Sequence, residues 1–496
     1  MGIYTNKFYI TTPIYYVNDK PHIGHAYTTI VADIIARWHR LKGEEVFFLT
    51  GTDEHGEKIE KAAEESKMTP QEFVDKIVEQ YKTTWKKLNI SYDYFIRTTD
   101  KKHIDTVEKF IGLLIKAGDV YSGEYEGWYC VPDETFFTDL QLKNGKCPEC
   151  GRGVAKLKEK THFFKLSAYQ QRLLDFYKAN PRFLSPNLRA TEIVNRVTEG
   201  LKDISITRAT VKWGVSFDTE HTVYVWVDAL LNYISALDWP NGEKFNTFWP
   251  ADVHIIGKEI NWFHSVIWPA MLFSAGLEAP KKVFAHGWWT SYGKKMSKSM
   301  HNFVDPIYIS DKYSTDVLRY FLIKEMPFGN DGDFSIKSLE ARINGELVSD
   351  YGNLIYRVLT LTERYKGKIE GKVELDKTLN LEKINNLMQE LDLFNAINEI
   401  WDFIRSANKY INENEVWKLE GMELGTALYN LLEACRITSI LLYPFMPETS
   451  EKVAKQLGTD IRNLEDCKFM PFNGSPKKGA PLFKKIEKNA IHQSPE

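Results

Sequence analysis

Strand-like and helix-like segments alternate along the amino-terminal part of the chain, and this alternation restricts the possible folds more than any other sequence feature. Residues 7–17, KFYITTPIYYV, form an apolar run of β-branched and aromatic side chains, as in a buried strand. Apolar residues then recur at helical spacing from Ile30 to Leu41. The strand-like EEVFFLTGTDEHG and the helix-like KIEKAAEES repeat this order. The alternation predicts an α/β fold with a doubly wound parallel sheet of Rossmann type.

The later sequence splits this α/β domain and extends the chain beyond it. Short aromatic strands, glycines and the turn CPECG begin near residue 118 and indicate an inserted module. Strand and helix patterns return with VYVWVDALLNY, VHIIGKEI and KVFAHGWW, and amphipathic helical spacing follows. We therefore predict a first α/β half (1–117), an insertion (118–218), a second α/β half (219–290), a lysine-rich loop with a linking region (291–345), a helical bundle (346–470) and a C-terminal strap (471–496).

The composition is that of an ordinary globular protein, with 43% hydrophobic and 26% charged residues. No run approaches the length of a transmembrane helix, and MGIYTNKFYI lacks the charged start and apolar core of a signal peptide, so we expect a cytoplasmic protein. The net charge of −3 does not indicate a nucleic-acid binder, although basic patches can be local. Five cysteines are too few for a disulfide framework, and three of them crowd between Cys130 and Cys150, which favours metal binding.

Two histidines flank the first strand-to-helix junction, in the stretch KPHIGHAYTTI. His22 and His25 stand where the free N–H groups and the dipole of a helix favour an anion, so their imidazoles could contact phosphate oxygens. A pair of surface histidines in a turn is the alternative. A second candidate phosphate site is the loop SYGKKMSKSMHN, whose lysines and serines are suited to wrapping a triphosphate. An ordinary solvated loop is the alternative there.

The two motifs together resemble the signature of the class I aminoacyl-tRNA synthetases, HIGH at 22–25 and KMSKS at 295–299. Along essentially its whole length the chain is similar to the methionyl-tRNA synthetases, in the stretches TTPIYYVNDKPHIGH, TGTDEHG, VYVWVDALLNY, IGKEINWFHSVIWPAM and SDYGNLIYR. The resemblance implies a methionine–tRNA ligase that joins methionine to ATP as methionyl-adenylate, releases pyrophosphate and transfers methionine to the 3′ end of tRNA(Met). It also implies that Mg²⁺ accompanies the ATP.

The first of these steps needs no strong side-chain base, because a carboxylate is already ionised at neutral pH. Its demand is electrostatic, since negative charge develops on the transferring group and on pyrophosphate. The resemblance therefore implies His22, His25, Lys295 and Lys298 as catalytic groups. It implies that ATP is also bound by Gly24, Gly257, Met296, Ser297 and Lys298.

The methionine site implied by the resemblance combines an ammonium partner with an aromatic slot that suits a polarizable thioether. Asp53 would bind the amino group, and the walls would be Ile14, Tyr16, Trp226, Ala229, Tyr233, Ile260, Phe263 and His264, with Trp268 behind them. Taken alone, Asp53 could equally cap a helix, and most of the aromatic residues would be assigned to the core. The insertion looks too small for the editing module of the leucyl, isoleucyl and valyl relatives, and a shaped pocket can recognise methionine without one.

The turn CPECG has the C-x-x-C spacing of half a zinc site. Methionyl-tRNA synthetases with this knuckle carry a second C-x-x-C, whereas this chain has Asp133 in place of its last cysteine. Cys130, Asp133, Cys147 and Cys150 could complete a tetrahedron around a structural Zn²⁺, because a carboxylate oxygen can bind zinc. A turn without metal is the alternative.

In the helical bundle, Asn353 and Arg357 lie four residues apart and so share one helix face. The resemblance implies that these two residues read the CAU anticodon of tRNA(Met) and that Trp417 stacks on an anticodon base. A solvated polar face and a buried tryptophan are the alternatives. Some relatives carry an added C-terminal module that dimerises and binds tRNA. This chain ends before such a module, so we expect a monomer or an association with a separate tRNA-binding subunit.

Three other functions compete with this interpretation. Another class I synthetase and an adenylyltransferase acting on a small acid would share the ATP motifs, but the helical bundle and NLIYR argue against an enzyme that does not use tRNA. A non-catalytic RNA-binding relative would be free to lose HIGH, KMSKS and Asp53, which are all intact.

Overall fold

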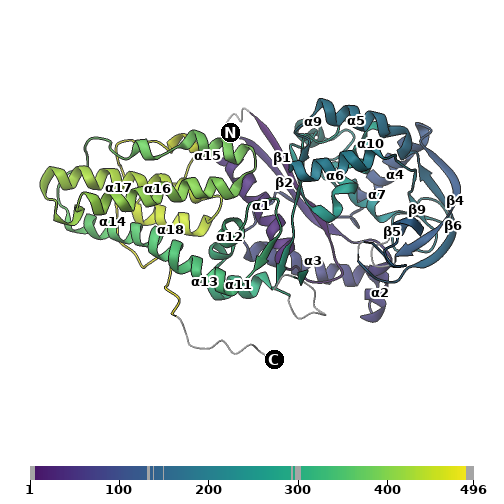
Figure 1. Ribbon diagram of the computed structural model, residues 1–496, viewed down its shortest axis with the longest axis horizontal. Helices are drawn as coiled ribbons and strands as arrows, with labels where there is room; N and C mark the ends of the chain where they lie inside the picture. The colour runs from purple at the N-terminus through teal and green to yellow at the C-terminus, as the bar shows by residue number, and fades with distance from the viewer. Residues whose placement is uncertain are drawn as a thin grey trace.

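The computed structural model describes residues 6–130, 135–137, 139–148, 150–291, 294–295 and 303–487. The molecule is elongated, with an α/β body at one end and a helical bundle at the other (Figure 1). This arrangement confirms the predicted fold class. No helix in the described part of the chain is long and apolar enough to cross a membrane.

The body is built on a six-stranded sheet whose neighbouring strands are all parallel. The spatial order is β3 (Tyr94–Arg97), β2 (Glu45–Asp53), β1 (Lys7–Tyr16), β11 (Val253–Gly257), β12 (Val283–His286) and β7 (Leu184–Ser185). The register pairs Tyr16 with Asp53 and Gly257 with His286. Four strand ends therefore meet along one carboxyl edge, which is where ligands of doubly wound sheets bind. The edge strand β7 comes from within the predicted insertion.

Helices cover both faces of this sheet, because its strands are apolar on both sides and cannot be left facing water. The helices of the body are α1 (Ile23–Leu41), α2 (Glu57–Glu65), α3 (Pro70–Lys87), α4 (Lys101–Lys116), α7 (Val225–Leu230), α8 (Asn232–Ser235), α9 (Glu243–Phe248) and α10 (Trp268–Ser274). A short π-helix, Phe263–Ile267, leads into α10. One apolar core lies on the α1 and α3 side of the sheet and a second on the α4 and α10 side.

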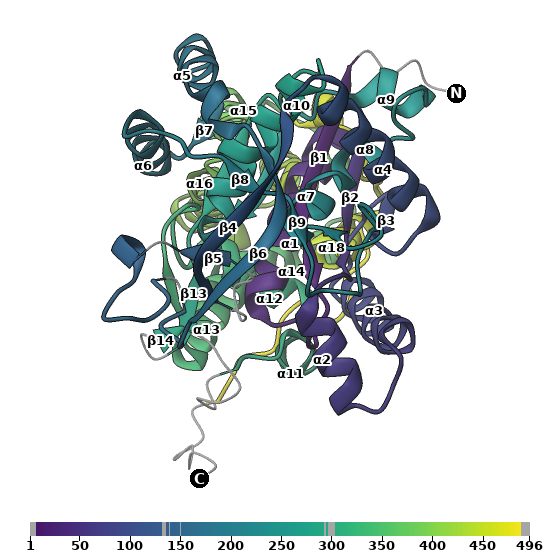
Figure 2. The same cartoon turned by 90° about the vertical axis from the view of Figure 1, so that its right-hand side faces the viewer.

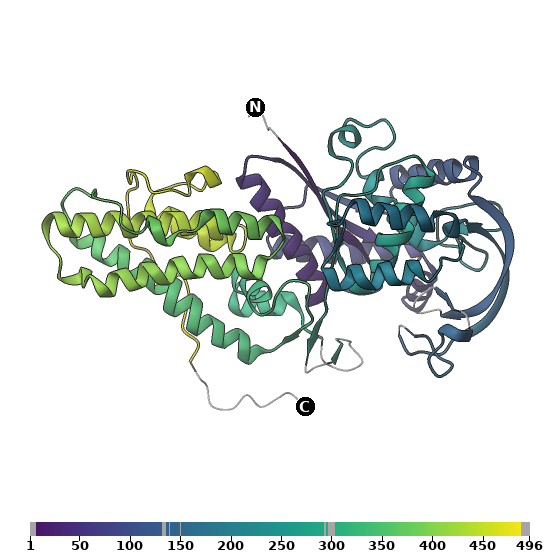
Figure 3. The ribbon, with the colours of Figure 1, turned by 45° about the horizontal axis from the view of Figure 1, so that its top comes forward.

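The insertion is dominated by a long antiparallel ribbon of β4 (Val120–Cys130) and β6 (Ala155–Phe164), which curves around the far end of the body (Figures 2 and 3). Its smaller elements are β5 (Thr135–Phe137), α5 (Gln170–Ala179), α6 (Asn187–Thr198), β8 (Ile204–Ser205) and β9 (Thr207–Arg208). β9 pairs with β10 (Thr222–Val223), which follows the insertion.

A small sheet and two helices connect the body to the bundle. In the sheet, β13 (Trp289–Ser291) pairs antiparallel with β14 (Lys294–Lys295) and parallel with β15 (Gly332–Phe334). The helices are α11 (Pro306–Tyr313) and α12 (Thr315–Lys324). The bundle consists of α13 (Ile336–Arg342), a π-helix (Ile343–Gly352), α14 (Asn353–Arg364), α15 (Leu381–Gln389), α16 (Leu393–Glu413), α17 (Gly421–Leu442) and α18 (Pro447–Leu457). The chain then returns to the π-helix, where the side chain of Asn344 binds the backbone N–H and C=O of Ile486.

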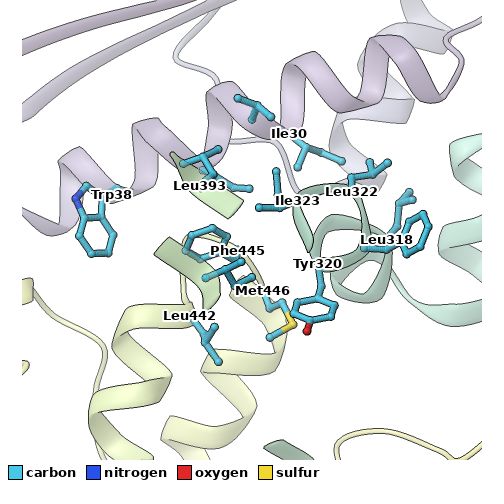
Figure 4. Close-up of a cluster of buried hydrophobic side chains, with 14 of the residues drawn as sticks. Ile30, Trp38, Leu318, Tyr320, Leu322, Ile323, Leu393, Leu442, Phe445 and Met446 are labelled. Atoms are coloured by element: carbon cyan, nitrogen blue, oxygen red, sulfur yellow. The ribbon is translucent and has the colours of Figure 1, made fainter. Parts of the chain in front are cut away.

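The body and the bundle share one continuous apolar core where α1, α12 and the turn after α17 meet (Figure 4). Ile30 and Trp38 of α1, Leu322 and Ile323 of α12 and Phe445 of that turn are buried together in this cluster. Because α1 carries His22 and His25 at its start, this shared core fixes the candidate site relative to the bundle.

Candidate active site

The first component of the site is the junction between β1 and α1, where His22 and His25 form a reciprocal capping box. Nδ1 of His22 accepts the backbone N–H of Gly24 at 2.9 Å, and Nδ1 of His25 accepts the backbone N–H of His22 at 3.2 Å. The two imidazole rings stack with their centroids 3.8 Å apart. A Cβ on Gly24 would lie 2.8 Å from the His22 ring, so this ring position requires the glycine.

The capping box determines which nitrogen of each histidine carries the proton. A ring nitrogen that accepts an N–H bond is unprotonated, so each neutral imidazole carries its proton on Nε2. Burial and the adjacent His22 lower the pKa of His25 well below its usual value, so His25 is neutral at physiological pH. Both rings therefore supply Nε2–H donors beside the carboxyl edge of the sheet.

The lysine-rich loop starts from β14, where Lys295 pairs through its backbone with Thr290 of β13. The side chain of Lys295 lies outside the described atoms, and Met296, Ser297 and Lys298 lie outside the described residues. The structure thus places the start of the loop and leaves the predicted phosphate contacts of these four residues as predictions.

The residues that follow the loop lie against the histidine junction. The backbone C=O of Val304 accepts the N–H of Ile23 at 3.2 Å, and Asp305 forms an ion pair of 2.6 Å with Lys20. The edge of the Phe303 ring faces the His22 ring, with centroids 6.1 Å apart. HIGH and the carboxyl end of the KMSKS loop are therefore neighbours in the fold.

Asp53 and Tyr16 lie side by side at the ends of β2 and β1, as the strand register requires. Asp53 is only 9% exposed, and Lys58 lies over the Tyr16 ring with Nζ 5.0 Å from the centroid. Ile14, two residues before Tyr16 and on the same face of β1, packs at the edge of the second core. These three predicted methionine-site residues thus occupy one short stretch of the carboxyl edge.

The other residues predicted for the methionine site lie on α7, α8, the short 3-10 helix Lys258–Ile260, the π-helix Phe263–Ile267 and α10. Trp226 stacks on Phe263 at 3.9 Å, and the hydroxyl of Tyr233 bonds Nε2 of His264 at 2.7 Å. The ring of Trp268 lies 6.1 Å from that of Tyr233. Ala229 is buried on α7 and Ile260 is half-buried at the start of this cluster. The structure therefore brings these residues together as one aromatic cluster.

A second hydrogen bond determines which group donates in the Tyr233–His264 pair. Nδ1 of His264 lies 3.0 Å from the C=O of Ile260 and must donate to it, so Nε2 of His264 accepts the Tyr233 hydroxyl proton. Burial lowers the pKa of His264 to about 4, which keeps the ring neutral. His254, which the motifs did not single out, stacks on Tyr233 at 4.1 Å. Its only sequence signal is a histidine inside an apolar strand.

A buried network that the sequence did not reveal joins the TGTDEHG loop to α7. Asp228 accepts hydrogen bonds from His55 at 2.6 Å and from His103 at 2.7 Å, and all three side chains are buried. Although burial opposes ionisation, the two histidines hold the pKa of Asp228 well below its usual range. The network ties the loop after β2, which follows Asp53, to α7, which carries Trp226.

Gly257 ends β11 at the same edge, and the carboxylate of Glu259 lies directly against it. A Cβ on Gly257 would be 2.5 Å from Oε2 of Glu259. The sequence signal for Glu259 is weak, because an acidic residue two positions after a strand is common in helix starts.

The cysteine cluster of the insertion contains Cys130, Cys147 and Cys150, whose sulfur atoms lie within 4.8 Å of one another. The sulfurs of Cys130 and Cys150 are 3.5 Å apart. Tetrahedral zinc with Zn–S bonds of about 2.3 Å would place them about 3.8 Å apart, so the three thiols fit the ion. Asp133, the predicted fourth ligand, lies outside the described residues.

A second group, His162, Asp218 and His221, also has ligand-forming atoms within 4.8 Å of one another. His221, however, is engaged at both nitrogens, since Nδ1 lies 2.9 Å from Asp218 and Nε2 lies 3.0 Å from the C=O of Lys160. Asp218 also raises the pKa of His221, against the effect of burial. We therefore interpret this group as an ion pair that closes the turn before β10.

The predicted anticodon residues lie together on the bundle. Asn353 is exposed at the start of α14, one turn before Arg357. The Arg357 guanidinium donates to Oδ1 of Asn412 at 2.9 Å and lies 6.0 Å from the centroid of the Trp417 ring. Trp417 is 52% exposed, which excludes the alternative of a buried helix anchor.

Comparisons with known proteins agree with this geometry. The family model described as tRNA synthetases class I (M) matches residues 8–157 and 152–359, and that of the anticodon-binding domain of tRNA ligase matches residues 375–479. The chain is 49% identical over 503 residues to a methionine–tRNA ligase of Caldanaerobacter subterraneus subsp. tengcongensis, covering 97% of this chain and 79% of that protein. It is also 49% identical over 506 residues to a methionine–tRNA ligase of Thermotoga maritima, covering 97% of this chain and 80% of that one.

Solved structures show the same likeness. Mycobacterium tuberculosis methionyl-tRNA synthetase in complex with methionyl-adenylate matches with a TM-score of 0.92 and 38% identity, covering 97% of this chain and 100% of that chain. The apo form of the same enzyme matches with a TM-score of 0.87 and 34% identity, covering 99% of this chain and 100% of that chain. These findings confirm the resemblance drawn from the sequence motifs.

Proposed function

Because this chain belongs to the methionyl-tRNA synthetase family of class I tRNA synthetases, we propose a role for each part of the site in the reaction of that family. The activity is the ATP-dependent ligation of methionine to tRNA, through methionyl-adenylate and with release of pyrophosphate. The observation that carries the assignment of roles is the His22–His25 box, which supplies two neutral N–H donors at the carboxyl edge of the sheet.

The nucleotide lies over this edge, with its phosphates against α1. Nε2–H of His22 and of His25 donates to phosphate oxygens as charge develops on the transferring group. Lys295 and Lys298 close over the leaving pyrophosphate, assisted by Met296 and Ser297. Mg²⁺ bound with the ATP substrate would offset part of the phosphate charge. The adenosine lies beside Gly257. The contacts of residues 303–305 with the histidine junction support this closure, because they hold one end of the loop in place.

Methionine lies between Asp53 and the aromatic cluster. The Asp53 carboxylate pairs with the substrate ammonium group, which positions the substrate carboxylate to attack the α-phosphorus. The thioether enters the slot formed by Trp226, Phe263 and the Tyr233–His264 pair, with Ile14, Tyr16, Ala229, Ile260 and Trp268 around it. Neutral His264 favours this arrangement, since a buried imidazolium beside an uncharged sulfur would be costly.

The experiment that tests this proposal measures the exchange of labelled pyrophosphate into ATP, with methionine and with a panel of other amino acids. We expect methionine to support exchange at least about 10²-fold better than leucine or cysteine, because a shaped pocket that excludes water discriminates at this level. Exchange that is driven better by another amino acid would reject the assignment of the methionine site.

The anticodon is read by Asn353, Arg357 and Trp417. We expect Arg357→Ala to lower the rate of tRNA(Met) charging by about 10²-fold, because a charged hydrogen bond to a base edge contributes about 1–3 kcal/mol. Pyrophosphate exchange should stay within about twofold of the unchanged protein, since α14 lies outside the α/β body. Lys409→Ala, on an exposed face of α16, is the matched control. Equal loss of charging and exchange would contradict the anticodon role.

Cys130, Cys147 and Cys150, with Asp133 as the fourth ligand, would hold a structural Zn²⁺. The ion would crosslink the end of β4 to the CPECG turn and would take no part in the reaction. The proposed location of the protein is the cytoplasm, where its tRNA substrate is used in translation.

A further inference from the structure

The strongest unassigned feature is a clamp of side chains around the end of β11, formed by Lys258, Glu259, Trp288 and Asp331. The indole N–H of Trp288 donates to Oε2 of Glu259 at 2.6 Å. Both oxygens of Glu259 would lie within 2.6 Å of a Cβ on Gly257, so the carboxylate is held flat against the backbone at the carboxyl edge. The proposed function uses Gly257 but assigns nothing to Trp288.

Trp288 is itself held at two points, its backbone and its ring. Its backbone N–H donates to Oδ1 of Asp331 at 2.7 Å. Nζ of Lys258 lies 4.2 Å from the centroid of the indole ring and pairs with both oxygens of Asp331, at 2.6 and 2.7 Å. A cation over an indole face and an ion pair behind it resist rotation of the ring. The clamp therefore restricts the direction from which Trp288 can donate.

The pairing within the clamp determines the chemistry that Glu259 offers. Lys258 is paired with Asp331, and the donor that Glu259 receives within this clamp is the neutral indole N–H of Trp288. A carboxylate has about four acceptor sites on its two oxygens, so it can accept further hydrogen bonds beside this one. A carboxylate at the carboxyl end of a Rossmann strand is suited to accept hydrogen bonds from the hydroxyl groups of a ribose. The Glu259 carboxylate lies against Gly257, which is where we propose that the adenosine binds.

We propose that Trp288 is a positioning residue that aims the Glu259 carboxylate at the ribose hydroxyls of ATP and so determines the preference for ribonucleotide over deoxyribonucleotide. This inference rests on the proposed function, because it takes the nucleotide to lie beside Gly257. Trp288 need not touch the substrate, since its effect passes through the orientation of Glu259. The expected signature is a change in nucleotide selectivity and not merely a loss of activity.

The test compares Trp288→Phe with Trp128→Phe in methionine-dependent pyrophosphate exchange, with ATP and with 2′-deoxy-ATP. Trp128 is the matched control, because its indole also donates to a carboxylate at 2.6 Å, that of Asp139, in the insertion. We expect Trp288→Phe to raise KM for ATP about tenfold, since a hydrogen bond to a charged group is lost, while kcat and KM for methionine change less than about twofold. The preference for ATP over 2′-deoxy-ATP should fall by about the same factor.

Two further variants make the result decisive. Glu259→Gln should remove the ribose preference by itself, and adding Trp288→Phe to it should have no further effect, because both changes act on one contact. Trp288→Tyr should restore part of the preference, because its hydroxyl can still donate. Unchanged selectivity in Trp288→Phe with lost selectivity in Glu259→Gln would overturn the role of Trp288. Absence of methionine-dependent exchange in the unaltered protein would instead overturn the proposed function.

Discussion

Replacing Asp33 with asparagine is expected to lower the free energy of unfolding by about 3–5 kcal/mol, because it leaves two buried arginines without their counter-charge. Asp33 and Arg319 are fully buried, and Arg37 is nearly so. One oxygen of Asp33 accepts from Arg37 at 2.8 Å and from Arg319 at 2.7 Å. Although burial opposes ionisation, the two guanidinium groups lower the pKa of Asp33 to about 2.

The low pKa of Asp33 gives this prediction a pH dependence with a definite sign. A carboxyl group whose pKa is depressed on folding stabilises the protein fully above its unfolded pKa, which is about 3.9. This stabilisation is lost only as the pH falls through the folded pKa of about 2. The difference in stability between the unaltered protein and Asp33→Asn should therefore be constant from pH 5 to pH 8.

Urea unfolding followed by circular dichroism measures this difference. The matched control is Asp402→Asn, which removes an exposed carboxylate at 64% side-chain exposure and should change stability by less than about 0.5 kcal/mol. Combining Asp33→Asn with Arg319→Met should cost less than the sum of the two single changes, because the second removes a buried charge that the first left uncompensated. A loss below about 1 kcal/mol in Asp33→Asn would show that the arginines find other partners.

The same network explains how the bundle is attached to the body. Besides binding Asp33 of α1, Arg319 donates to the backbone C=O groups of Pro444 at 2.8 Å and of Phe445 at 3.1 Å, at the turn after α17. Buried carbonyls without a donor are costly, so this single side chain satisfies three polar groups on two elements at once. The network adjoins the apolar cluster of Figure 4 at Phe445, whose backbone C=O accepts from Arg319. It thereby ties the bundle to α1.

The sequence predicts those parts of the structure that depend on local spacing. The parallel sheet follows from the alternation of strand and helix, and the place of His22 and His25 follows from the junction between β1 and α1. The neighbouring ends of β1 and β2 explain why Tyr16 and Asp53 meet, although they are 37 residues apart in the chain.

The contacts that the sequence did not predict join residues with no local pattern. Asp33 and Arg319 are 286 residues apart, and His55 and Asp228 are 173 apart. In the sequence Asp228 is one polar residue in the apolar run VYVWVDALLNY, and no nearby feature predicts which residues it binds. Trp288 and Glu259 come from two strand ends that are brought together only by the parallel pairing of β11 and β12. Such pairs become visible only when the strand order is known.

Replacing His22 with asparagine is expected to lower the rate of methionyl-adenylate formation by about 10²–10³-fold while leaving the fold intact. Asparagine is a strong N-cap residue, and its side-chain oxygen can accept the Gly24 N–H that Nδ1 of His22 accepts at 2.9 Å. Its remaining donor, the amide Nδ2, lies closer to the backbone than Nε2 of the imidazole and does not reach the same position. The substitution therefore removes the proposed phosphate contact and keeps the helix cap.

His22→Ala separates the two roles of this residue, because alanine removes the cap as well as the donor. We expect His22→Ala to be less stable than His22→Asn by about 1 kcal/mol in thermal unfolding, with the same loss of rate in single-turnover assays of adenylate formation. If His22→Asn instead keeps most of the rate of the unaltered protein, His22 acts only by capping α1. The phosphates would then be contacted by His25 and the lysine loop, and not by His22.

His25 is neutral, because its pKa lies well below the usual value. The ratio between the rates of His22→Asn and of the unaltered protein should therefore show no titration of His25 between pH 6 and pH 8.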